Sequence, residues 1–325
     1  MPTLRTGLTI AVIAVTAAVA GATVAKATAS SGGTQAAPDH AHDGDHMIRP
    51  VATTDADWTS LVTAIGRSGK LAADGLSYKV GFPRRDLTVT SYGVTIKPSF
   101  ALAGNATFAK YPDGHAMLMG DLVVTEAEAP TVTDALQAGG ITQSAIHKHL
   151  LAESPPLRWM HIAGMGDPVT LAKAVKAAID TTATPPPAPP APPGTIDLDT
   201  ARIDAALGGN GTVDGGVYKF TFARHDTNTE ANHVIPPGLD VTTALNFQPL
   251  DAGRAAINGD VAMTAGEVQH VLAALRHGGI TVVSLHNHAL DDSPRLFYTH
   301  FWATGDAVTL AKALRAALDQ TAITR

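Results

Sequence analysis

Histidines are the residues whose spacing in this sequence most clearly predicts chemistry. Of the 14 histidines in the 325-residue chain, six form two triads with the pattern H-x-H, eleven residues, H. Each member of the first triad has an equivalent 139 residues later. The triads consist of His147, His149 and His161, and of His286, His288 and His300.

This pattern predicts a metal site in each triad. Zinc and copper(II) both favour imidazole nitrogen, and three such ligands leave a coordination position for water or substrate. Alternate residues of a strand share a face, so the two histidines of each H-x-H pair are expected to point the same way. A hairpin that brings the third histidine onto that face would complete an N₃ site, for which we expect zinc in preference to copper. A metal-free polar pocket and purely structural histidines are the alternative interpretations.

Carboxylates near each triad are candidates for orienting the imidazole rings or transferring protons. Asp121 and Asp260 lie on the strand expected to precede each triad, and Glu153 and Asp292 lie at the tip of each expected hairpin. None of the four stands in a motif specific to catalysis, so the sequence leaves open whether the protein is an enzyme. If it is one, a metal-bound hydroxide that attacks an ester, amide or phosphoester is the expected chemistry.

The triads belong to a unit that the chain contains twice. The segment GDPVTLAK at 166–173 matches GDAVTLAK at 305–312, and a tract of prolines at 185–193 separates the two copies. Such a tract favours an extended spacer and marks a domain boundary. We therefore predict a signal peptide at 1–27, a leader at 28–54 that is too polar to fold alone, a first repeat at 55–182, a linker at 183–195 and a second repeat at 196–325.

Each repeat is expected to have an α+β fold. In the first repeat, strands are predicted at 76–82 and 116–125, and a hairpin is predicted from 141–149 and 157–163. Capping boxes at Thr125 to Glu128 and at Thr264 to Glu267 predict the start of a helix in each repeat. The resulting order β-α-β-β-α suggests an antiparallel sheet backed by helices, a ferredoxin-like core with extra strands.

Composition restricts the location and class of the protein. The first 27 residues combine Arg5, an apolar run at 8–25 and the A-x-A pattern at 25–27, which together predict an export signal cut before Thr28. We expect a secreted or extracytoplasmic chain with no stable membrane span after cleavage.

The absence of cysteine excludes disulfides, thiol catalysis and lipidation at a cysteine. A net charge of −6 without a dense basic patch argues against nucleic-acid binding.

The leader carries a further group of possible ligands. Its segment DHAHDGDH at 39–46 interleaves three histidines with three aspartates. Such a segment can chelate a divalent cation weakly, and it is equally well explained as a solvated acidic leader.

A family resemblance adds to this interpretation. The segments SLHNH at 284–288, PRLFYTHFWA at 294–303 and GDA at 305–307 resemble the LppY/LpqO family of bacterial envelope lipoproteins, as do GDLV at 120–123 and HKHLL at 147–151. The resemblance spans both repeats as a tandem duplication. It implies an envelope or secreted location and no specific activity, because the family is a domain of unknown function. Lipoproteins need a lipobox cysteine, which this chain lacks.

Together these features predict a secreted protein that binds a divalent metal, zinc or copper, through one H-x-H…H site in each repeat. Two alternatives remain: a metal-dependent hydrolase, and a module that binds a cell-wall polymer or glycan in a metal-free polar pocket. The expected partners are the metal ion and, under the alternatives, a small-molecule substrate or wall polymer.

Overall fold

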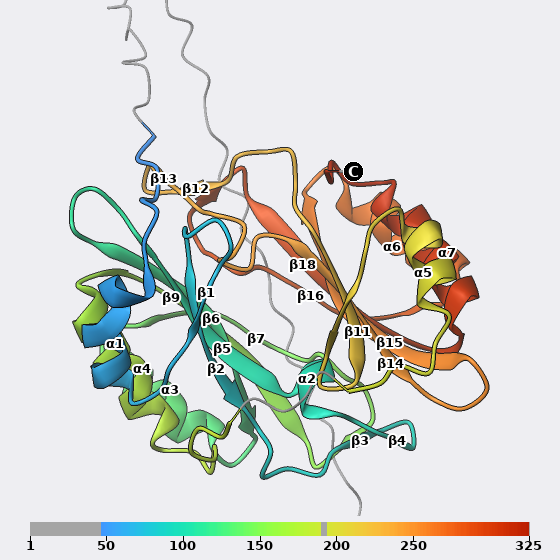
Figure 1. Ribbon diagram of the computed structural model, residues 1–325, viewed down its shortest axis with the longest axis horizontal. Coiled ribbons are helices and arrows are strands. Elements are labelled where there is room, and N and C mark those ends of the chain that lie inside the picture. The colour runs from blue at the N-terminus through green and yellow to red at the C-terminus, as the bar shows by residue number, and fades with distance from the viewer. Residues whose placement is uncertain (1–46, 190–193, 325) are drawn as a thin grey trace, which may run out of the picture. The chain divides into compact units, whose positions relative to one another are not determined.

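The computed structural model describes residues 47–189 and 194–324, and both repeats belong to one compact unit (Figure 1). Each repeat contains a six-stranded sheet in which all neighbouring strands are antiparallel. The first sheet has the order β1 (Lys70–Leu71), β2 (Tyr78–Pro83), β5 (Ala103–Lys110), β6 (Ala116–Thr125), β9 (Leu157–Gly166) and β7 (Thr142–His147). The second has the order β10 (Thr212–Asp214), β11 (Val217–Phe222), β14 (Thr243–Pro249), β15 (Arg254–Thr264), β18 (Leu296–Asp306) and β16 (Thr281–His286). The predicted α+β class with two antiparallel repeats is confirmed.

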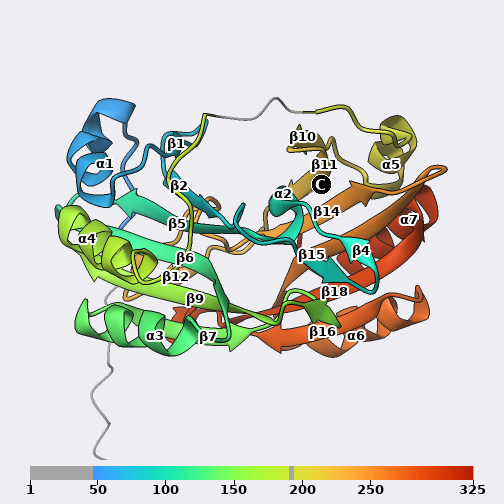
Figure 2. The ribbon, with the colours of Figure 1, turned by 90° about the horizontal axis from the view of Figure 1, so that it is seen from below.

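Helices cover one face of each sheet, and Figure 2 shows them on the outer sides of the two sheets. They bury apolar residues at helical spacing, such as Val132, Leu136 and Val175, in one core with Ile162 of β9. The equivalent core of the second repeat is built in the same way. The helices are η1 (Asp55–Trp58), α1 (Thr59–Ile65), α3 (Ala129–Ala138) and α4 (Pro168–Ile179) in the first repeat, and α5 (Thr200–Leu207), α6 (Val268–His277) and α7 (Ala307–Leu318) in the second.

The predicted helix starts are present in the structure. Ahead of α3, the Thr125 amide donates to Glu128 Oε2 at 2.8 Å. Ahead of α6, the Thr264 amide donates to Glu267 Oε2 at 2.7 Å. The same two carboxylates pair with buried arginines, because Arg84 Nη1 lies 2.7 Å from Glu128 and Arg224 Nη1 lies 2.8 Å from Glu267. These interactions make both glutamates structural residues.

The second face of each sheet packs against the other repeat. Strand β6 is buried along nearly its whole length, which explains its almost continuous apolar sequence. Leu118 and Leu122 face the helices, whereas Met119 and Val123 belong to cores that contain residues of the second repeat. Asp121 has the same parity as Met119 and Val123, so strand alternation directs this carboxylate toward the second repeat.

Two excursions from the sheets cross between the repeats. The first contains β3 (Thr90–Ser91), β4 (Val94–Thr95) and α2 (Pro98–Ala101), and its Lys97 amide donates to Gln248 Oε1 at 2.9 Å. The second contains β12 (Thr229–Glu230) and β13 (His233–Val234), and the Val234 carbonyl accepts from the Tyr111 hydroxyl at 2.8 Å. Each excursion also pairs with a short strand of its own repeat, β8 (Glu153–Ser154) or β17 (Asp292–Ser293). Each repeat therefore extends one segment that contacts the other repeat.

Several predicted segments lie partly or wholly outside the described residues. These are the signal peptide at 1–27, the histidine-containing segment at 39–46 and residues 190–193 of the linker. The described end of the predicted leader pairs with the folded unit, since the Val51 amide donates to the Lys110 carbonyl at 2.8 Å. The described part of the linker is also held, because Arg67 Nη2 donates to the Pro185 carbonyl at 2.6 Å. Within the described residues, no helix has the length and apolar content needed to cross a membrane.

Candidate functional site

The three histidines of each triad are placed by one hairpin. His147 is the last residue of β7, His149 lies two residues after the end of that strand, and His161 lies in β9. Ala145 is the residue opposite His161, and His147 is opposite Trp159, after a bulge between Gln143 and Ala145. Directly opposite residues point to the same face, so His147 and His161 share the face that meets the other repeat. The second repeat arranges His286, His288 and His300 in the same way along β16 and β18.

The structure brings all six histidines into one group at the contact between the repeats, here named the histidine cluster, in which His149 is partly exposed and the other five are buried. The rings of His147 and His286 stack with centroids 3.9 Å apart. The ring of His149 contacts that of His300 at 3.7 Å, and its equivalent contact, His161 to His288, measures 3.8 Å. Residues 139 positions apart thus make matching contacts. The two triads predicted from the sequence therefore lie together in one cluster.

Within the histidine cluster, one grouping joins each H-x-H pair to the third histidine of the other repeat; the ligand atoms of His147 also lie within 4.8 Å of those of His286 and His300, and of those of Asp121 and His161. His147 Nε2 lies 3.0 Å from His149 Nε2 and 3.2 Å from His300 Nε2. We call these three residues the first set. The second set contains the equivalent residues His161, His286 and His288, whose ligand atoms all lie within 4.8 Å of one another.

Backbone carbonyls lie against Nδ1 of three of the rings, one of them His288, whose Nδ1 is 2.7 Å from the Asp240 carbonyl. His161 Nδ1 lies 3.3 Å from the Gly120 carbonyl, and His300 Nδ1 lies 2.7 Å from the Gly259 carbonyl. A carbonyl accepts only, so each Nδ1 carries the proton and each Nε2 presents a lone pair. This tautomer directs Nε2 of His161 and of His300 into the cluster, as metal-ligating histidines require.

The two predicted aspartates stand beside the histidines. Asp121 Oδ2 lies 3.0 Å from His149 Nε2, and Asp260 Oδ2 lies 3.0 Å from His288 Nε2. Burial raises the pKa of Asp121 well above its usual range, and the charges of Asp240 and Asp260 add to this effect. Burial acts on Asp260 in the same direction, but His300 and His288 outweigh it and leave the pKa of Asp260 below its usual value. Asp260 is therefore the more readily ionised of the two carboxyls.

Burial favours the neutral form of most of these imidazoles. Burial lowers the pKa of five of the six histidines, and the neighbouring rings lower it further in most of them. A neutral ring is the form that coordinates a metal ion. The five are His147, His149, His161, His286 and His300.

Several buried polar atoms of the cluster have no hydrogen-bond partner among the described residues. They include Nε2 of His161 and of His286, Nδ1 of His147, and Oδ1 of Asp121 and of Asp260. An unpaired buried polar atom costs stability unless something else satisfies it. A cation bound between these atoms would supply the missing interaction, so the donor set fits a divalent metal.

The other two predicted carboxylates lie outside the cluster. Glu153 Oε1 lies 2.6 Å from Lys148 Nζ, and Asp292 Oδ2 accepts from the Leu296 amide at 2.9 Å. Both support the hairpin tips, and neither belongs to a group of possible metal ligands in the described part of the chain. Of the four acid–base candidates, the structure places Asp121 and Asp260 at the histidines.

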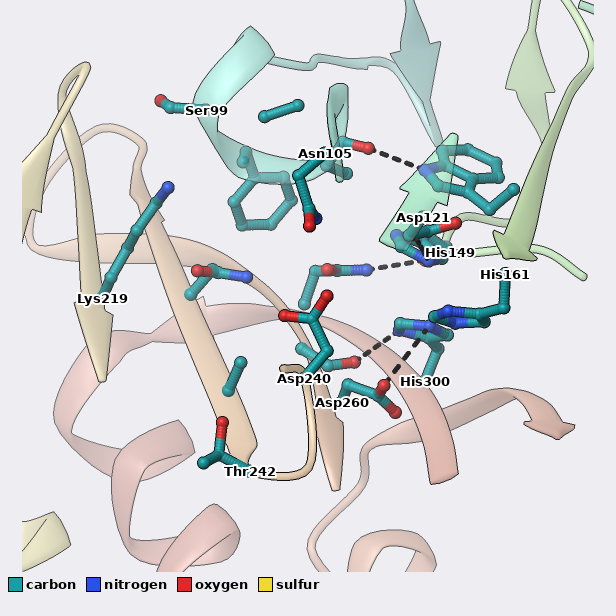
Figure 3. A pocket seen from close by; sticks show the side chains of 18 of the residues that line it. Ser99, Asn105, Asp121, His149, His161, Lys219, Asp240, Thr242, Asp260 and His300 are labelled. Atoms are coloured by element: carbon teal, nitrogen blue, oxygen red, sulfur yellow. Dashed lines mark hydrogen bonds and ion pairs between the residues drawn. The ribbon is translucent and has the colours of Figure 1, made fainter. Parts of the chain in front are cut away.

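A pocket of about 190 Å³ opens beside the histidine cluster, between the repeats (Figure 3). Its lining includes Asp240, which the sequence did not indicate because this residue lies in the excursion before β14 and has no equivalent acidic residue in the first repeat. Polar side chains predominate around it. They are Ser99, Asn105, Asp121, His149, His161, Lys219, Asp240, Thr242, Asn246, Asn258, Asp260, His288 and His300.

Solved structures give only distant similarities. A trimeric bacterial microcompartment shell protein, PduB, matches with 12% identity and a TM-score of 0.22, covering 78% of this chain and 91% of that one. A double-ringed trimeric shell protein of the RMM microcompartment matches with 12% identity and a TM-score of 0.19, covering 63% and 82%. EtuB from Clostridium kluyveri matches with 10% identity and a TM-score of 0.18, covering 78% and 90%. Scores this low do not establish a shared fold.

The comparison with protein families is more informative. No curated protein matches the chain. A family model described as Domain of Unknown Function (DUF1259) matches twice, at residues 59–181 and 201–320. This match overturns the resemblance to the LppY/LpqO lipoproteins, which was wrong as a family assignment. The two matches coincide with the two repeats, and the chain belongs to the family described as Domain of Unknown Function (DUF1259).

Proposed function

We propose that the protein binds divalent metal, with zinc preferred over copper, in the two histidine sets that cross between its repeats. The observation that carries this proposal is the convergence of five buried histidines, the partly buried His149 and two buried aspartates, several of them with unpaired ligand atoms. Each set combines an H-x-H pair from one repeat with the third histidine of the other. We therefore expect two ions per chain.

Ligand spacing supports zinc. A tetrahedral zinc ion with nitrogen ligands at about 2.0–2.1 Å places those nitrogens roughly 3.3 Å apart. In the first set, the distances from His147 Nε2 to the other two Nε2 atoms are 3.0 and 3.2 Å. Three nitrogens at such spacing leave one position for water or for a nearby carboxylate such as Asp121.

Binding is favoured over hydrolysis by the positions of the carboxylates. Hydrolysis needs a general acid or base near the open coordination position. Glu153 and Asp292 are engaged at the hairpin tips, and Asp121 and Asp260 contact the histidines directly. We include an extracytoplasmic location in the proposal because the export pattern at 1–27 supports it, and such a location would make the protein a metal carrier or buffer outside the membrane.

Metal content by plasma mass spectrometry tests the proposal with two double variants. In all samples the leader residues His40, His42 and His46 are replaced by alanine, and no histidine tag is used. His149→Ala with His300→Ala damages only the first set, so one zinc per chain should remain. His149→Ala with His161→Ala damages both sets, so zinc should be lost. If each site lay within a single repeat, the first double variant would lose both zinc ions and the second would keep one.

The matched control is His270→Ala, which alters an exposed helical histidine away from the cluster. It should retain the zinc content of the unaltered protein. Unaltered protein that holds no zinc or copper after reloading would refute metal binding. Circular dichroism of each variant verifies that the loss of metal is not a loss of fold.

A further inference from the structure

The histidine cluster is symmetric, but the access to it is one-sided. In the second repeat, Asn246 and Asn258 line the pocket. Their equivalents in the first repeat, by sheet register, are Thr107 and Met119. Met119 is only 2% exposed and packs in a core with Leu239. One side of the cluster is therefore sealed by apolar packing, whereas the other opens into a polar pocket.

Asp240 is held in this pocket by an unfavourable backbone conformation. Its φ is +56°, in the left-handed region that side chains other than glycine rarely adopt. The Asp240 carbonyl accepts from His288 Nδ1 at 2.7 Å, and Oδ1 lies 3.2 Å from Lys79 Nζ. Oδ2 is buried without a hydrogen-bond partner. Figure 3 shows this carboxylate directed into the pocket between Asn105 and Asp260. Strain of this kind, combined with an unpaired acceptor, is typical of a binding site.

The lining indicates a neutral ligand with hydroxyl groups. Asn246 makes no side-chain hydrogen bond within the described residues, and Asn105 uses only its oxygen, as the acceptor for Thr107. An amide group offers both hydrogen-bond donors and an acceptor. It therefore suits a hydroxyl group, which also both donates and accepts hydrogen bonds. The lysine of the lining, Lys219, is already neutralised by Asp214 at 2.6 Å. With unpaired carboxylate oxygen and no free lysine, the pocket does not favour an anion.

We propose that this pocket binds a monosaccharide-sized molecule with several hydroxyl groups, held by Asp240 and by the amides of Asn105 and Asn246. Its volume of about 190 Å³ is smaller than the roughly 300–1,000 Å³ of sites for drug-sized ligands, which limits the occupant to about one sugar ring. The inference rests on the proposed metal sets only for its position, because the polar contacts come from residues outside both sets.

Isothermal titration calorimetry on the full chain tests the proposal. The probes are glucose, galactose, mannose and N-acetylglucosamine, with citrate as an anionic probe of comparable size. At least one sugar should bind. Asp240→Asn tolerates the left-handed backbone but removes the charge, so it should weaken binding by about tenfold or more. Asn246→Leu should weaken binding similarly by removing the amide. The control Asp251→Asn, at a highly exposed carboxylate, should leave it unchanged.

The outcomes separate this proposal from metal binding. Each titration is run on chelator-treated and on zinc-loaded protein, and the metal content of the same samples is measured. Protein that holds two zinc ions but binds no sugar, or binds citrate alone, overturns the pocket proposal and leaves the metal sets standing. Sugar binding by protein that retains no zinc after zinc loading supports the pocket and refutes the metal sets. Sugar affinity that is unchanged by both pocket variants also overturns the proposal.

Discussion

Acidification of the metal-free protein from pH 7.0 to 5.5 is expected to lower its free energy of unfolding steeply. Five histidines of the cluster have their pKa lowered in the folded state, so they bind protons less readily there than in the unfolded state. The unfolded state then binds more protons than the native state below pH 6.5, so the free energy of unfolding decreases as the pH is lowered. The effect is absent well above pH 6.5, where histidine is neutral in both states.

The magnitude follows from the number of neutral rings. With an unfolded-state pKa of about 6.5, each ring loses about 1.2 kcal/mol over this interval, or about 6 kcal/mol for five. Asp121 acts in the opposite direction, because its raised pKa lets the folded state hold a proton that the unfolded carboxyl lacks. This offset is at most about 2 kcal/mol, which leaves a net loss of about 4–6 kcal/mol. A typical domain has only about 5–15 kcal/mol in total.

Urea titrations in the presence of a chelator, followed by far-ultraviolet circular dichroism, measure this loss. Tryptophan fluorescence is unsuitable, because Trp159 stacks on His149 with centroids 4.6 Å apart and would report the ring's protonation directly. The double variant His147→Gln with His286→Gln removes two of the five rings and should show a correspondingly smaller loss. If the unaltered protein loses less than about 1.5 kcal/mol, the claim that these rings are neutral in the fold is wrong.

Three further perturbations have defined outcomes. Gly259→Ala places a Cβ 2.2 Å from the Ala244 carbonyl oxygen, so urea titration should show a loss of about 1–3 kcal/mol; an unchanged midpoint would contradict this close approach. Arg84→Met leaves Glu128 without its buried partner and should cost about 3 kcal/mol, with zinc content preserved in the folded fraction; loss of zinc there would connect this distant pair to the cluster. Zinc at 100 times its dissociation constant should stabilise the unaltered protein by about 2.7 kcal/mol for each site, or about 5.4 kcal/mol for the two proposed sites, and should not stabilise the His149→Ala, His161→Ala variant.

Local signals in the sequence were sufficient to predict many of the helices and strands. The capping boxes at Thr125 and Thr264 marked real helix starts, because such boxes depend on contacts three residues apart. The strands at 103–110 and 243–249 were not predicted. The first of these contains three alanines, a glycine and an asparagine, which are uncommon in strands, and its pairing with β6 compensates for that weak propensity.

The site was predicted in its members but not in its grouping. Spacing along one hairpin correctly placed His147 and His161 on a common face. It could not indicate that His300 would complete the first set, because that contact depends on how two sheets pack across residues far apart in sequence. Asp240 was missed for the same reason: its role depends on an excursion that crosses between the repeats and leaves no local pattern.

The crossed sets make the chain equivalent to a dimer whose subunits are covalently joined. A single repeat contains only two of the three histidines of one set and one of the other, so separate repeats would have to associate before either set existed. Within one chain, the linker replaces that bimolecular encounter by an intramolecular one, with an effective concentration set by the length and stiffness of the linker. Formation of both sets is thereby independent of how dilute the protein becomes. For a protein exported from the cell, this independence would preserve metal binding at concentrations where a dissociable pair of single repeats would fall apart.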